Sequence, residues 1–427
     1  MRHGPHFKAS EDRASTHGLN SPLSSIPHRF RATLYLVGTL LLLLIPAVSL
    51  AQNRPPSSFS QLAENARKAS EENRLDDAAV LYAKALALRP RWSEGWWSLG
   101  TLEYDRDQYR KAAHAFTKLI ALEPRNGTAH AMLGLCQFEL HSDNSALQNL
   151  LAAENLGILK DEQLRKVAVY HLGVLQLRAS KFSSAQETLS QLAADRIRTN
   201  ELTTALGLAA LLVRPQEMPP EGSRGYRVVN QVGDAEAALA AKDFDTARKI
   251  FSGLLEEFPK YPNLHLAYGR FLLGLNETDD AVSQFQEELK RDSQNIHCML
   301  EIAAVRYQVD SQNGLSYAEQ AVKLAPQFPL GHYLLGLLRL DTGDVAGAIP
   351  ELELARKGLP REPKVYFALG NAYARVGKKI EAAEARAEFA RLNARSAQAP
   401  GPGVQGENPS GLTQKELQSL EKERPNR

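Results

Sequence analysis

The sequence has little cysteine and almost no net charge. It contains two cysteines in 427 residues, Cys136 and Cys298, which lie far apart inside helical patterns. A buried small side chain is a more common role there than a disulfide or a pair of metal ligands. The 51 Lys and Arg residues nearly balance the 49 Asp and Glu residues, for a formal net charge of +2. Without a strongly basic surface, we expect no nucleic-acid partner.

The sequence also lacks the short motifs that mark common catalytic and cofactor sites. No HExxH, no CxxC, no phosphate loop of the GxxxxGK type and no nucleophile elbow occurs. Three histidines stand at one repeated place, three residues before a Leu-Gly or Tyr-Gly pair: His130, His265 and His332. A packing role explains them better than metal binding or acid–base catalysis. We therefore predict a protein that is not an enzyme and has no catalytic, metal or cofactor site.

One long apolar run, residues 34–50, lies near the amino end. Arg29 and Arg31 precede it, and Ser49 and Ala51 supply the small side chains that a signal peptidase requires. These features predict an exported protein, periplasmic or secreted, that is cleaved after Ala51. The alternative keeps the run as a membrane anchor, because its length is close to the lower limit for spanning a bilayer. Membrane contact is expected only through this segment if it is not cleaved.

A second pattern recurs along most of the chain from residue 59. It places a Leu-Gly pair in one helix, a small residue and an aromatic in the next, and a proline after it: Leu99, Gly100, Ala112, Phe116 and Pro124 in residues 93–126. Small residues allow two antiparallel helices to approach closely, and the larger residues, with Trp96, fill the seam between them. The alanines of successive units stand at intervals of about 34 residues.

This pattern resembles the tetratricopeptide repeat, although Tyr104 comes one place later than the aromatic of that family. The resemblance covers residues 59–395. It implies an all-α fold, a right-handed superhelical solenoid of about nine stacked antiparallel helix pairs. Proteins of this family bind other proteins.

The pattern is interrupted once, after Leu206 and Gly207, by a segment rich in Pro and Gly. The array is expected to bend or hinge there, and an ordinary surface loop is an equally good explanation. The predicted organisation is a leader and signal peptide or anchor (1–51), a linker (52–58), the first half of the array (59–213), the break (214–226), the second half (227–395) and a disordered tail (396–427).

The tail contains one short segment with helical character, residues 412–424. Thr413 and Glu416 have the spacing of a capping box, and Leu412, Leu417 and Leu420 are its apolar residues. We predict a transient helix, because so short a helix is marginal in water when isolated.

The family resemblance also implies a partner-binding groove, lined by the first helix of each pair. Transferring the groove positions residue by residue gives an apolar strip: Trp97, Tyr104, Leu135, Phe138, Tyr170, Val174, Tyr333, Leu337, Phe367 and Asn371. Trp96 and Trp97 are about 100° apart on a helix, so we expect Trp96 to point into the seam and Trp97 into the groove. The alternative for any one of these residues is packing between successive repeats.

These observations together favour a protein–protein interaction scaffold or assembly factor that binds partner segments in its concave groove outside the cytoplasm. The alternative functions are a chaperone-like holdase, which would use the same groove for unfolded segments, and an accessory subunit of an envelope enzyme complex. A protein or peptide is the expected partner in each case.

Overall fold

The computed structural model describes residues 58–158 and 161–398, which fall into two compact units divided at Pro124 and Arg125. Its regular structure in these residues is helical throughout, with 19 α-helices and one short 3-10 helix, so the predicted all-α class is confirmed. None of the described helices is long and apolar enough to cross a membrane. The predicted leader, the apolar run 34–50 and residues 399–427 of the tail lie outside the described residues.

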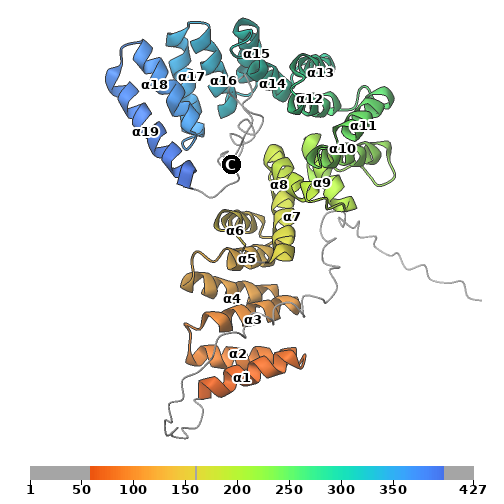
Figure 1. The fold of residues 1–427 in the computed structure, drawn as a ribbon, viewed down its shortest axis with the longest axis vertical. Coiled ribbons are helices and arrows are strands. Elements are labelled where there is room, and N and C mark those ends of the chain that lie inside the picture. Colours follow the sequence, from red (N-terminus) through yellow and green to blue (C-terminus); the bar gives the residue numbers. More distant parts are fainter. Residues whose placement is uncertain (1–57, 159–160, 399–427) are drawn as a thin grey trace, which may run out of the picture. The chain divides into compact units, whose positions relative to one another are not determined.

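The first unit contains two helix pairs (Figure 1). Helix α1 spans Ser58–Glu71 and packs against α2, which spans Leu75–Leu88. Helix α3 spans Ser93–Asp105 and packs against α4, which spans Tyr109–Leu122. Short turns join the members of each pair, so the two helices run antiparallel.

The second unit continues the same scheme and contains one helix that belongs to no regular pair. Before the break the helices are α5 (Gly127–Glu139), α6 (Asp143–Leu156), α7 (Glu162–Arg178), α8 (Phe182–Ala194) and the extra helix α9 (Asn200–Ala210). After it come α10 (Arg224–Ala240), α11 (Phe244–Glu257), α12 (Leu264–Gly274), α13 (Thr278–Arg291), α14 (Ile296–Arg306), α15 (Ser311–Leu324), α16 (Pro329–Asp341), α17 (Val345–Gly358), α18 (Pro363–Arg375) and α19 (Lys379–Gln398). Apart from α9, the described helices form nine consecutive pairs, as predicted.

Close approach within the pairs depends on the repeated glycine. A Cβ atom added to Gly100 would lie 2.8 Å from ring atoms of Phe116, closer than such atoms normally approach. The same relation, with the partner on the second helix of the pair, recurs at 2.7 Å for Gly134 and Leu150, 2.5 Å for Gly173 and Leu189, 2.4 Å for Gly269 and Phe285, and 2.6 Å for Gly336 and Leu352. The predicted role of Gly100 in the seam is therefore confirmed.

The interruption in the repeat is filled by a different helix contact. Helix α9 is followed by a loop with the 3-10 helix Pro215–Glu217, and α10 then packs directly against α9. A Cβ atom on Gly207 would lie 1.8 Å from the carbonyl oxygen of Val229, and one on Gly233 would lie 1.8 Å from that of Thr203. The two backbones are thus in direct contact. The predicted break lies inside the second unit, and its role as a hinge stays a prediction.

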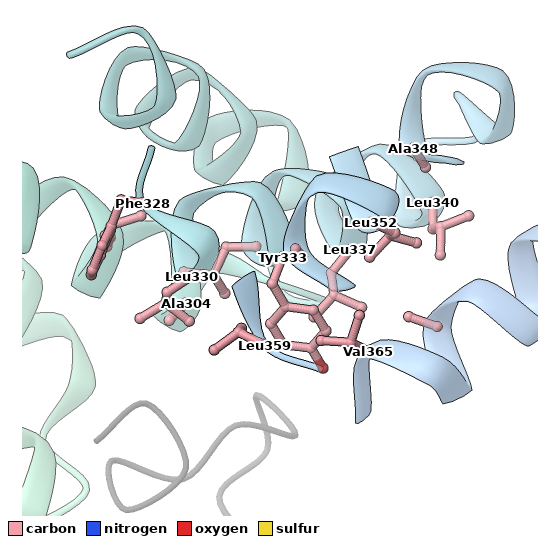
Figure 2. Packing of buried hydrophobic residues seen from close by; sticks show 14 of the residues in the cluster. Ala304, Phe328, Leu330, Tyr333, Leu337, Leu340, Ala348, Leu352, Leu359 and Val365 are labelled. Atoms are coloured by element: carbon pink, nitrogen blue, oxygen red, sulfur yellow. The ribbon is translucent and has the colours of Figure 1, made fainter. Parts of the chain in front are cut away.

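The last three pairs of the second unit, α14 to α19, share one apolar cluster. Figure 2 shows its carboxyl-terminal part, where Tyr333 and Leu337 of α16 lie beside Leu359 and Val365. Val365 belongs to α18, the first helix of the next pair. The core therefore continues from pair to pair, which is how a solenoid is stabilised.

Candidate functional site

Six of the ten predicted groove residues are buried. None of these six is more than 8% exposed: Leu135, Phe138, Tyr170, Val174, Tyr333 and Leu337. Trp97, Tyr104 and Asn371 are half-buried, and Phe367 is 53% exposed. The strip residues of the second unit are therefore mainly packing residues, the alternative that the sequence left open, and the role of the strip in partner binding stays a prediction.

The neighbouring first helix covers two of these side chains, Phe138 and Tyr333. Phe138 of α5 shows this most directly, because two side chains of α7 lie on its ring. The ring of His171 meets it edge-to-face at 4.5 Å between centroids, and the guanidinium of Arg178 lies 4.6 Å from its centroid. Burial also lowers the pKa of His171 to about 4, so this imidazole stays neutral against the aromatic ring. In the same way Figure 2 shows Tyr333 close to Val365 of α18.

The tryptophan pair of α3 differs from the expectation. Trp97 packs edge-to-face on the seam residue Phe116, with ring centroids 5.7 Å apart. Trp96 donates its indole N–H to the carbonyl oxygen of Pro90 at 2.8 Å and lies beside the ring of His114. The prediction that only Trp96 faces the seam is wrong, because a large indole can reach the seam from the neighbouring position along the helix.

The bond from Trp96 to Pro90 is repeated along the chain. Each time, a ring in this helix position bonds to the carbonyl oxygen of the proline six residues earlier: His265 to Pro259 at 3.1 Å, His332 to Pro326 at 2.8 Å and Tyr366 to Pro360 at 2.9 Å. These bonds fasten the end of one pair to the start of the next. The packing role of the histidines is thus extended by a hydrogen bond, which the constant spacing to the proline could have indicated.

All three histidines at this helix position, His130, His265 and His332, also contact the second helix of their own pair. His130 lies 2.9 Å from Asn149, His265 lies 2.7 Å from Gln284, and His332 lies 2.6 Å from a carboxylate oxygen of Glu351. Among the described residues, no group of three or more His, Cys, Asp or Glu side chains is arranged to hold a metal ion. Geometry therefore assigns these histidines to helix-to-helix contacts.

Both cysteines are free and fully buried. Burial raises the pKa of the Cys136 thiol to about 12, and burial also raises the pKa of the Cys298 thiol. A protonated, inaccessible thiol is a poor nucleophile and a poor metal ligand. The prediction of small buried side chains at both positions is confirmed.

Charged groups buried in the first helices of the second unit were missed by the sequence reasoning. Arg270 of α12 donates from Nε to Glu301 of α14 at 2.7 Å, and the two residues are 9% and 6% exposed. Gln186 of α8 donates to Glu236 of α10 at 2.7 Å, and Glu236 is 3% exposed. The available signals were the positions of Arg270 and Glu301, each inside an otherwise apolar segment, 266–273 and 298–305.

The buried carboxyl group of Glu236 should make the stability of the protein depend on pH. Burial raises its pKa from 4.5 to about 7, although the bond from Gln186 and the charge of Arg270 oppose the shift. The folded protein therefore holds this proton at pH values where the unfolded chain has lost it. As the pH rises from about 4.5 to about 7, the free energy of unfolding should fall, by at most about 1.4 kcal/mol per pH unit.

The matched variant is Glu236→Gln, which keeps the shape and removes the titration. Urea denaturation at several pH values in this window should show a flatter dependence for the variant than for the unchanged protein. An equal dependence of the free energy of unfolding on pH in the two proteins would contradict the assignment of this dependence to Glu236.

Comparison with known proteins supports the repeat fold. Family models described as tetratricopeptide repeat match residues 98–155, 238–297 and 304–363. Superkiller protein 3 of Schizosaccharomyces pombe is 22% identical over 297 residues, which are 67% of this chain and 20% of that protein. The chain thus spans a fifth of the length of this curated relative.

Solved structures are also similar over long stretches. The crystal structure of MamA is 19% identical, with 38% of this chain and 96% of that chain covered at a TM-score of 0.36. The APC/C hetero-tetramer Cut9–Hcn1 is 14% identical, with 80% and 88% covered at a TM-score of 0.36. Yeast Tom70 is 12% identical, with 79% and 97% covered at a TM-score of 0.29.

Proposed function

We propose that this chain, which contains tetratricopeptide repeats in residues 98–155, 238–297 and 304–363, is a non-catalytic scaffold that binds segments of a partner protein outside the cytoplasm. The observation that carries the proposal is the series of stacked helix pairs, which account for nearly all the described residues. Stacked pairs of this kind present extended surfaces to other proteins.

Trp97 and Tyr104 are the best candidates for the contact with a partner. Both are half-buried, in contrast to the six covered strip residues, and they stand two turns apart on one face of α3. Trp97 rests on Phe116 and Tyr104 rests on Tyr109, with ring centroids 5.4 Å apart in the second contact. Rings that are held on one side lose little side-chain entropy on binding, so they suit the role of anchors.

The test begins with a crosslinked pull-down from envelope extract, using the fragment that starts at Gln52, to identify a partner. Replacing Trp97 and Tyr104 together by Ala should then weaken binding of that partner by about 2 kcal/mol or more. Trp96→Ala is the control, because its indole bonds to Pro90 rather than lying beside Phe116. Thermal melts must show that each variant is folded at the assay temperature, since Trp97 also packs on the seam.

Unchanged affinity in the double variant, at full folding, would contradict the proposed groove. A holdase would give a different result from a scaffold, because it would slow the aggregation of unrelated unfolded clients without a defined partner. The two assays on the same preparation therefore separate these functions.

Export is supported by the sequence of the amino end alone. Arg29 and Arg31 precede the apolar run 34–50, and small residues stand at the expected cleavage point before Gln52. Amino-terminal sequencing of the protein recovered from its natural source should begin at Gln52. An intact amino end in the membrane fraction would favour the anchor instead.

A further inference from the structure

The last helix pair leaves uncovered a position that is buried in three earlier pairs of the second unit. Phe367 stands three residues before the glycine of its pair, as do Tyr170, Leu266 and Tyr333. These three are at most 3% exposed, whereas Phe367 is 53% exposed. The difference arises because α18 has no following first helix among the described residues.

The second helix of the last pair shows the same exposure. On α17, Ile349 packs against the shared core, and Glu353 accepts a hydrogen bond from the Tyr373 hydroxyl of α18 at 2.6 Å. The matching positions one repeat later, on α19, are Ala383 and Ala387, and both are exposed. The face that meets the next pair in α17 is thus open in α19.

The last pair also exposes large apolar side chains. Ile380 at the start of α19 is 74% exposed, and Val376 before it is 42% exposed. With Phe367, they make three of the large apolar side chains exposed in the described part of the chain, all within the last pair. The outer face of a terminal repeat is expected to be polar when water alone covers it. An apolar face there indicates that something packs on it.

We propose that the carboxyl-terminal segment 412–424 of this chain forms one further helix and docks on the open face of α18 and α19. Thr413 and Glu416 supply a capping box. Leu412 and Leu417 stand directly before the cap and at the fourth helical position, which is the spacing of a hydrophobic staple. Leu417 and Leu420 then lie on one face of the helix and present it to the array.

The length of the segment fits the position that it would fill. Pro425 ends the helix, so residues 414–424 are the helical part. The first helices α12 and α14 have 11 residues each, which is the same length. The new helix would therefore take the place of the next first helix in the array.

The connection is long enough and keeps the segment close. Residues 399–411 are rich in Gly and Pro and give a root-mean-square span of roughly 20 Å. Helix α19 has 20 residues and is about 30 Å long, so the segment can return along much of it. A tether of this length holds the segment at an effective concentration in the mM range, which a second copy or another protein does not reach. Docking also explains how a helix too short to persist alone becomes stable.

The first experiment is a disulfide crosslink in the full chain. Ala387→Cys combined with Leu417→Cys should form a disulfide within one chain when the protein is treated with oxidised glutathione. The control combines Leu417→Cys with Gln286→Cys, an exposed position on α13. The native cysteines are fully buried and do not interfere. A crosslink between two chains would show that a second copy occupies the face, and equal yields in both pairs would also overturn the proposal.

The second experiment is amide hydrogen exchange of residues 414–424 in the full chain. Docking should slow exchange there by about tenfold or more, and Leu417→Asp with Leu420→Asp should abolish this protection. The control variant, Gln418→Asp with Ser419→Asp, adds the same charge on the opposite face of the helix and should keep the protection. Unprotected amides in the unchanged protein, or equal loss in both variants, would overturn the proposal.

Discussion

Gly207→Ala should lower the free energy of unfolding of the second unit by about 3 kcal/mol or more, at the upper end of the range for overpacked cores. The added Cβ would lie 1.8 Å from the carbonyl oxygen of Val229, and 2.8 Å from its carbonyl carbon. Backbone atoms cannot rotate away as a side chain can, so α9 and α10 must separate. Gly233→Ala should have an effect of similar size, because it meets the carbonyl oxygen of Thr203 at the same distance.

The control is Gly253→Ala on α11, where a Cβ atom meets nothing within 4 Å. Alanine favours a helix over glycine by about 0.5–1 kcal/mol, so this variant should be slightly more stable than the unchanged protein. Urea denaturation of the three variants measures the loss of stability expected for Gly207→Ala and Gly233→Ala and the small gain expected for Gly253→Ala. If Gly207→Ala behaved like Gly253→Ala, the direct contact between α9 and α10 would not exist.

Arg270→Leu should destabilise the protein by about 3–5 kcal/mol, because it leaves the buried carboxylate of Glu301 without its partner. Both residues are almost completely buried, and the second carboxylate oxygen of Glu301 makes no hydrogen bond. The double variant, Arg270→Leu with Glu301→Leu, removes both charges and should recover most of the loss. The free energies of unfolding of the single and double variants give the coupling between the two side chains.

Lys290→Leu is the matched control for an exposed ion pair. Lys290 lies 2.6 Å from Glu287, but their side chains are 71% and 47% exposed. Water and salt screen such a pair, so its loss should change stability by less than about 1 kcal/mol. A small effect of Arg270→Leu, similar to that of Lys290→Leu, would mean that water reaches the pair between α12 and α14.

The seam could be predicted and the groove could not, for one physical reason. Gly100 must be small because α4, the helix that directly follows its own in the sequence, packs closely against it. This requirement can be read from one pair alone. Leu135 and Tyr333 are apolar in either role, and their exposure depends on how closely the next pair approaches. That distance is set by contacts such as His171 and Arg178 on Phe138, which lie one repeat away.

Residue types and their spacing predicted the seam glycines and the burial of both cysteines, and the resemblance to the tetratricopeptide repeat that they carry implied the all-α class and the number of helix pairs. These features depend on local periodicity and on contacts between helices that follow one another directly. Tertiary structure alone decided that α10 takes the place of a missing partner for α9, that Trp97 reaches the seam, and that Arg270 and Glu301 meet in the interior. The contact of α9 with α10 and the pairing of Arg270 with Glu301 depend on the packing of one helix pair against the next, and a side chain's own position in its helix does not specify what the neighbouring pair places against it. Trp97 reaches Phe116 within its own pair because its indole is large, which its position along the helix does not specify either.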